Sequence, residues 1–211
     1  MLEYMEPATP RPAPPGRDDL DELAGAIWPL GVDEYEHLAA RGAFGEQRVE
    51  LLRGVVVAMS PQGWGHAEVV ALLTEVLVLA LRGRYRVRPQ LPLRADDTSM
   101  PEPDLAVVEP GLRRSHPRQA LLVIEVAASS LRRDTRLKAL IYAEAGVPEY
   151  WVADINTGEL VRHTGPGRGG YRQVERLGRA AVLRPPALPE LELPVAELIP
   201  DAVIGALDEQ D

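Results

Sequence analysis

Two carboxylates lie inside short apolar segments of the sequence. Asp104 opens the run DLAVV, and Glu125 lies within LLVIEVA. A carboxylate in an apolar strand costs free energy unless it pairs with a cation or binds a metal ion. Carboxylate oxygens are hard ligands that suit Mg²⁺, which keeps bound waters that can meet a phosphate group. The two residues therefore predict a site for Mg²⁺ or Mn²⁺. The structural alternative for Glu125 is a salt bridge to a helix arginine.

Lys138 is the only lysine among the 23 basic residues of the chain. A lysine ammonium is a compact charge whose pKa responds to burial, whereas a guanidinium is broad and stays protonated. A single retained lysine is therefore a candidate for a charge that supports phosphoryl chemistry. The alternative is an ion pair on one helix face with Asp134, four residues earlier, which would stabilise the helix by only ~0.3 kcal/mol.

The arginines are clustered along the chain. Arg132, Arg133 and Arg136 form one group, and a second group lies between residues 82 and 88. The formal net charge of −9 argues against a protein that coats DNA nonspecifically, because such a protein carries a general positive field. The net charge does not exclude a local basic rim. Each cluster is thus either a set of phosphate contacts or a solvated face.

Several classes of chemistry lack the residues that they need. The chain has no cysteine, which excludes disulfides, thiolate zinc sites and cysteine nucleophiles. It has no GxxxxGK[ST] loop, no GxGxxG between a strand and a helix, and no GxSxG elbow. The glycine-rich run at 165–170 lies between strand-like segments and is expected to be a hairpin loop. The four histidines do not have the spacing of metal ligands.

The sequence shows no signal for secretion or for a membrane span. No basic stretch followed by an apolar one opens the chain, and the longest apolar run, at 69–81, is shorter than the ~20 residues of a membrane helix. We therefore expect a cytoplasmic protein without a membrane partner.

The elements that would position these residues form a mixed α/β pattern. Helices are predicted at 32–42, 66–82 and 134–145 from apolar periodicity and from their stop signals. A hairpin is predicted at 48–60, and strands at 85–93, 104–108, 121–126, 149–155, 159–163, 171–174 and 181–183. This order indicates one α/β domain with a mixed central sheet flanked by helices, an N-terminal hairpin and C-terminal edge strands. Its expected limits are residues 26–184. A proline-rich, disordered arm is expected at 1–25 and a proline-rich peripheral segment at 185–211.

Part of the sequence resembles the Uma-two family of restriction endonucleases, a branch of the PD-(D/E)XK nuclease superfamily. The resemblance rests on PEPDLAVV and on EVAASSLRRDTRLKALIYAEAGVPEYWVAD, within residues 101–154. It extends over about 32–174, where it includes RVELLRG and the entry to the helix at His66. The resemblance implies a restriction-endonuclease-like core.

The resemblance also implies roles for the acidic residues. Asp104 and Glu125 are similar to the aspartate and glutamate of the family motif, which bind the metal together with a backbone carbonyl, here that of Val126. Glu50 resembles the glutamate that completes the acidic cluster.

The resemblance assigns the lysine as well. Most of the superfamily has a lysine two positions after the motif glutamate, where this chain has Ala127. The family resembles a variant in which the lysine lies on the following helix, and here that residue is Lys138. Arg132, Arg133 and Arg136 border this lysine in sequence and are expected to contact DNA phosphates.

The activity that the resemblance implies is Mg²⁺-dependent hydrolysis of DNA phosphodiester bonds by an endonuclease. The resemblance also suggests a homodimer. One alternative is a catalytically weak or inactive member that binds DNA or another protein. A further alternative is a hydrolase that acts on a different phosphodiester. His66 is expected to be a helix-start or packing residue rather than a ligand.

Overall fold

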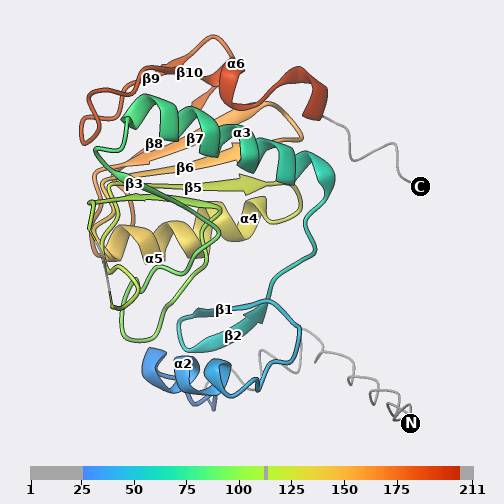
Figure 1. Cartoon of the computed structure of the whole chain (residues 1–211), viewed down its shortest axis with the longest axis vertical. Coiled ribbons are helices and arrows are strands. Elements are labelled where there is room, and N and C mark those ends of the chain that lie inside the picture. Colours follow the sequence, from blue (N-terminus) through green and yellow to red (C-terminus); the bar gives the residue numbers. More distant parts are fainter. Residues whose placement is uncertain (1–25, 112–113, 205–211) are drawn as a thin grey trace.

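The computed structural model describes residues 26–111 and 114–204. Its centre is a six-stranded sheet in the order β3-β4-β5-β6-β7-β8. The strands are β3 (Arg86–Pro89), β4 (Leu105–Val108), β5 (Leu122–Ala127), β6 (Glu149–Asp154), β7 (Glu159–Thr164) and β8 (Gln173–Leu177). Helices cover both faces of this sheet (Figure 1). The predicted mixed α/β fold is therefore confirmed, and the predicted arm at 1–25 lies outside the described residues.

The central strands are buried on both faces. Every residue of β4, β5 and β6 is buried, as expected for short apolar runs without polar alternation. β5 pairs in parallel with β6 and antiparallel with β4, and the remaining neighbours are antiparallel. Because β4 and β5 are adjacent, Asp104 at the start of one strand lies beside the end of the other, which carries Glu125.

One helix covers the first face of the sheet. Helix α3 (Trp64–Leu81) buries Val69, Leu73, Leu77 and Leu81 in the larger apolar cluster, which also contains residues of β4 and β5 and Trp151 of β6. By length and composition alone this helix could also cross a membrane, a test that core helices pass as well. The C-cap residue Arg82, directly after the helix, adopts a left-handed conformation that ends it.

The second face is covered by a helix that is not regular throughout. The helix predicted at 134–145 begins earlier, as α4 (Leu131–Arg133), continues as a π-helical turn, η1 (Asp134–Lys138), and ends as α5 (Ala139–Glu144). The Ala139 N–H reaches the Asp134 carbonyl five residues back, and this carbonyl also accepts a hydrogen bond from the Tyr150 hydroxyl at 2.9 Å. A wide turn of this kind is rare and is found frequently at functional sites.

A small N-terminal unit lies beside the main sheet (Figure 1). It consists of α2 (Val32–Ala40) and the antiparallel hairpin β1 (Val49–Leu52) and β2 (Val55–Ala58). A bridge between Leu51 and Met100 ties β1 to the segment that leads into Asp104. Gly54 in the hairpin turn has φ +78°, and a β-carbon there would lie 2.4 Å from the Cβ of Pro29. The hairpin and its glycine thus fix the position of Glu50 on β1.

The C-terminal segment belongs to the larger apolar cluster. A short pair, β9 (Val182–Leu183) and β10 (Leu193–Pro194), leads into α6 (Val195–Leu198) and the 3₁₀ turn η2 (Asp201–Val203). We expected a peripheral segment from residue 185 onward. In the structure this segment buries seven side chains in the same cluster as α3, namely Leu188, Leu191, Leu193, Val195, Leu198, Ile199 and Val203.

Candidate active site

A polar pocket opens where the end of β5, the start of β4, the hairpin, the start of α3 and the π turn meet. Its volume is about 100 Å³. These elements are distant in the sequence, so only the fold brings them together. The charged and polar side chains that line the pocket include Glu50, His66, Asp104, Glu125, Arg133, Asp134 and Lys138.

Asp104 is held by two donors on one oxygen. Its Oδ2 accepts hydrogen bonds from the Val126 N–H at 2.8 Å and from His66 Nε2 at 3.0 Å. Because an ionised carboxylate can only accept, His66 carries its proton on Nε2. The neighbouring Pro103 has no N–H to donate to the Val126 carbonyl, and the Asp104 carboxylate is the acceptor for the Val126 N–H on this side of β5.

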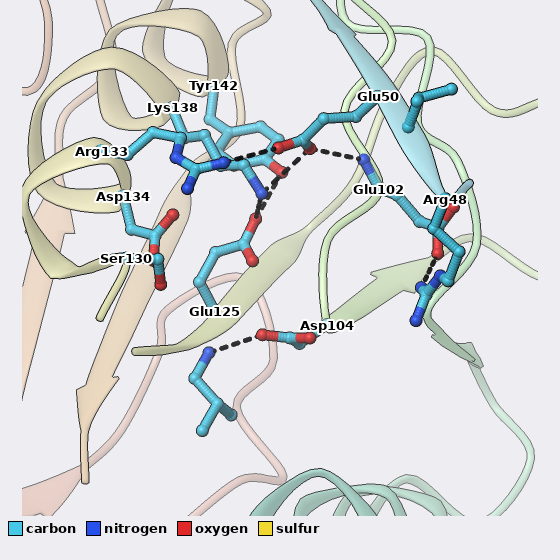
Figure 2. Close-up of polar contacts among 12 residues, drawn as sticks. Arg48, Glu50, Glu102, Asp104, Glu125, Ser130, Arg133, Asp134, Lys138 and Tyr142 are labelled. Carbon is cyan, nitrogen blue, oxygen red and sulfur yellow. Dashed lines mark hydrogen bonds and ion pairs between the residues drawn. The ribbon is translucent and has the colours of Figure 1, made fainter. Parts of the chain in front are cut away.

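Glu125 is paired with the sole lysine rather than with an arginine. Its Oε1 accepts hydrogen bonds from Lys138 Nζ at 3.0 Å and from the Tyr142 hydroxyl at 2.9 Å. Figure 2 shows the carboxylate of Glu125 between Lys138 and Asp104. The ammonium of Lys138 therefore points into the pocket, and only 5% of this residue is exposed.

Glu50 closes the cluster from the hairpin. Its Oε2 lies 3.1 Å from Lys138 Nζ and accepts a hydrogen bond from the Glu102 N–H at 3.3 Å. Its Oε1 lies 3.8 Å from a guanidinium nitrogen of Arg133. The structure thus brings Glu50, Asp104, Glu125 and Lys138 into one buried cluster, although 88 residues separate the first from the last.

Lys138 does not form the ion pair with Asp134 that was the alternative interpretation of its role. Asp134 is buried and accepts a hydrogen bond at 2.5 Å from Ser130 Oγ. No ion pair joins Asp134 and Lys138 among the described residues, whereas Lys138 contacts both glutamates. The helix-surface interpretation of Lys138 is therefore wrong, because the lysine faces the sheet and not the solvent.

Burial and mutual charge set the protonation of the cluster. Burial raises the pKa of Glu125, the Lys138 ammonium opposes this, and the charges of Asp104, Asp134 and Glu50 raise the pKa further. Burial alone would lower the pKa of Lys138, but Glu125, Glu50 and Asp134 outweigh it and raise that pKa above the ordinary value. Lys138 is therefore a permanent cation at neutral pH and not a general base.

The donor atoms suit a hard cation. Among the residues described, no hydrogen bond uses Oδ1 of Asp104 or Oε2 of Glu125. The Ala127 carbonyl accepts from Ile155 on the β6 side, so alternation along β5 turns the Val126 carbonyl toward β4 and the proline. No group of three or more His, Asp or Glu side chains within 26–111 and 114–204 could hold a metal ion unaided. Two carboxylates and a carbonyl would leave positions for water or phosphate, which is the usual environment of Mg²⁺.

The three predicted phosphate-binding arginines do not lie together. Arg133 lines the pocket, whereas Arg136 lines a separate groove beside β7 and β8 on the opposite side of the π turn. Arg132 is exposed and lines neither. Adjacent positions on a helix point in different directions, so clustering in sequence did not produce one basic rim.

Comparison with known proteins identifies the family. The model of the Uma2 family, described as "Putative restriction endonuclease", matches residues 32–196. The chain belongs to the Uma2 family. The matched range of the Uma2 model contains every residue of the pocket cluster.

A solved structure has the same fold. It is the crystal structure of "a putative nuclease belonging to DUF820" from Anabaena variabilis, with a TM-score of 0.65 and 18% sequence identity. The alignment covers 81% of this chain and 97% of that chain. No curated protein sequence matches the chain. At this level of sequence identity, the similarity shows only that the two proteins share a fold.

Sequence reasoning undervalued three residues of this Uma2 protein. His66 contacts Asp104, Tyr142 contacts Glu125, and Asp134 lines the pocket. The sequence could have indicated His66, because this residue lies near the start of a helix, in a part of the chain that the family resemblance covers. Tyr142 lies four residues after Lys138, on the same helix face, which was a usable signal.

Proposed function

We propose that this Uma2 family protein is a Mg²⁺-dependent endonuclease that hydrolyses DNA phosphodiester bonds. The observation that carries the proposal is the convergence of Asp104, Glu125 and the only lysine of the chain at one pocket. A structural ion pair would not require the second carboxylate, Asp104, to open on the same pocket. Family membership as a restriction endonuclease supports DNA as the substrate.

Asp104, Glu125 and the Val126 carbonyl would hold the cation. When bound, Mg²⁺ neutralises charge on the phosphoryl oxygens and makes a bound water more acidic. In the hydrolysis, a water oxygen adds to phosphorus and the bond to the departing sugar oxygen breaks, which leaves a phosphate monoester and a hydroxyl. One oxygen of the Glu125 carboxylate, Oε1, accepts from Lys138, and the other would bind the cation, so Glu125 links the two groups.

Lys138 would orient the attacking water and offset the negative charge that develops in the transition state. Glu50 and Tyr142 hold the cluster in place: Glu50 contacts Lys138 Nζ, and the Tyr142 hydroxyl fixes Glu125 Oε1. Arg133 lines the pocket and is the arginine that we assign to a substrate phosphate. Arg132 and Arg136 lie outside the pocket lining, so we assign them no contact with the reacting phosphate.

The proposal is tested by a cleavage assay with the purified full chain. Supercoiled plasmid, linear duplex and single-stranded DNA are incubated with Mg²⁺, with Mn²⁺ or with EDTA. We expect nicking or linearisation of the plasmid with either ion and none with EDTA. DNA binding without cleavage of any form would favour the inactive binding module. Hydrolysis of a small phosphodiester without DNA cleavage would favour the third class.

His66 supplies a further prediction, because it is one of two donors that fix Asp104 Oδ2. We expect His66→Ala to weaken Mn²⁺ binding by about 10-fold, the usual cost of losing a group that orients a metal ligand. His66→Gln keeps an N–H donor and should recover most of the affinity. Isothermal titration calorimetry of both variants with Mn²⁺ checks this, and wild-type affinity in His66→Ala would contradict it.

A further inference from the structure

A groove lies between helix α3 and the end of strand β3, next to the active-site pocket. Its volume is about 570 Å³. The groove and the pocket share one residue, Gln62, which lies in the loop before α3 and lines both. The groove therefore adjoins the place where the proposed function puts the reacting phosphate.

The lining of this groove suits an uncharged group rather than a phosphate. Its polar side chains are Gln62, Gln90, Thr74 and Glu75, and among the described residues Glu75 is the only charged one in the lining. A phosphate would be repelled by that carboxylate. The apolar part of the lining consists of Ala67, Val70, Ala71, Val78 and Pro89. Apolar walls with a few hydrogen-bonding groups fit a flat ring that has polar edges.

The two amide side chains of the groove are free to bind a ligand. Within residues 26–111 and 114–204, the side chains of Gln47 and Gln173 form hydrogen bonds, but those of Gln62 and Gln90 do not. Gln90 has φ +49°, a left-handed conformation that is uncommon for a residue other than glycine. Its N–H donates to the carbonyl of Asp104 at 3.0 Å. The backbone of Gln90 is thus tied to a residue of the proposed cation site.

We propose that this groove binds the base of one nucleotide beside the scissile phosphate, and that this base is adenine. The inference rests on the endonuclease function proposed above. A glutamine amide offers a donor and an acceptor side by side, which match N7 and the 6-amino group of adenine. The carboxylate of Glu75 can only accept, so it also favours a ring that carries an amino group. Guanine and thymine present a carbonyl oxygen at the corresponding edge, which Glu75 would repel.

Adenine must leave the base stack to reach the groove. A duplex exposes only the edges of its bases, whereas the groove lies between a helix and a strand of the protein. Turning a base out of the stack costs free energy in a paired duplex and costs least where the base is already unpaired. The favoured substrate is therefore a DNA strand with an unpaired adenine next to the bond that breaks.

The first test measures binding in EDTA, where metal-dependent cleavage does not interfere. The probes are short labelled thymine strands that contain one adenine, one purine without the 6-amino group, or neither. Fluorescence anisotropy gives the affinity of each probe for the full chain. We expect the adenine strand to bind ~10-fold more tightly than the all-thymine strand, and the purine strand to lose most of that gain. Equal affinities for the three strands would overturn the proposal.

Three variants test whether the preference arises in the groove. Gln90→Ala removes one amide, Ala71→Phe fills the groove, and each should lose most of the preference for adenine. Leu79→Phe is the matched control, because Leu79 is 66% exposed on the same helix but does not line the groove. It should keep the wild-type preference. The preference is a ratio within one variant, so a general loss of folded protein does not change it. A full preference in both Gln90→Ala and Ala71→Phe would exclude the groove.

The second test separates this inference from the function on which it rests. Single-stranded DNA of mixed sequence is cleaved in Mg²⁺, and the ends of the products are sequenced. We expect adenine on the same side of most cuts in the wild type and in Leu79→Phe, and a loss of this bias in Gln90→Ala. Cleavage without any base preference would overturn the adenine groove and leave the endonuclease intact. Preferential binding of the adenine strand without cleavage of any DNA would support the groove and overturn the endonuclease.

Discussion

Asp104→Asn is expected to reduce the rate of DNA cleavage by at least ~10³-fold, because it removes one of two charged ligands from the proposed cation site. Asparagine has nearly the shape of aspartate and keeps one oxygen that can accept from the Val126 N–H. The fold should therefore survive. Without metal, the variant should be as stable as the wild type or more so, since one charge is removed from a buried acidic cluster.

The same variant gives a readout that does not depend on activity. A ligand that binds only the folded state raises its melting temperature, and we expect millimolar Mn²⁺ to do so in the wild type. In Asp104→Asn most of that increase should be lost. Asp154→Asn is the matched control, because Asp154 is buried at the same end of neighbouring strand β6 but does not line the pocket. An unchanged increase in Asp104→Asn would remove the metal site from the proposal.

Lys138→Arg is expected to reduce cleavage by at least ~10²-fold, the usual effect of losing one positioned electrostatic group. The charge is kept, but a planar guanidinium is wider than an ammonium and cannot occupy the same slot between Glu125 and Glu50. Single-turnover rates with saturating Mg²⁺ measure the effect. Cleavage at the wild-type rate would mean that the lysine serves only the fold.

Lys138→Met separates the structural role from the catalytic one. Removing the ammonium leaves the buried Glu125 without a cation and Glu50 with only Arg133 at 3.8 Å, which should destabilise the metal-free protein by about 3–5 kcal/mol at neutral pH. The loss should shrink in acid. Burial already raises the pKa of Glu125 above the ordinary value of 4.5, and without Lys138 it rises further. A group with a raised pKa in the folded state loses stability as the pH rises above its unfolded pKa, so the deficit should appear above about pH 4.5. Urea denaturation at several pH values checks this sign.

The elements around the site could be predicted because their signals are local. Short apolar runs predicted β4 and β5, and the glycine after residue 145 predicted the end of α5. The π turn was not predicted. The Asp134 carbonyl in this turn accepts a hydrogen bond from Tyr150, which lies on the next strand, and no local pattern reports that contact.

The sequence by itself indicated that Asp104 and Glu125 belong to short apolar strands and that one lysine stands apart from 22 arginines. Those are properties of residue type and of short segments. The tertiary structure alone decided that Lys138 turns toward Glu125 and Glu50 rather than Asp134, and that Arg133 and Arg136 lie at different grooves. The direction of a helical side chain depends on how the helix is rotated against the sheet, and that rotation is set by packing between residues far apart in the chain.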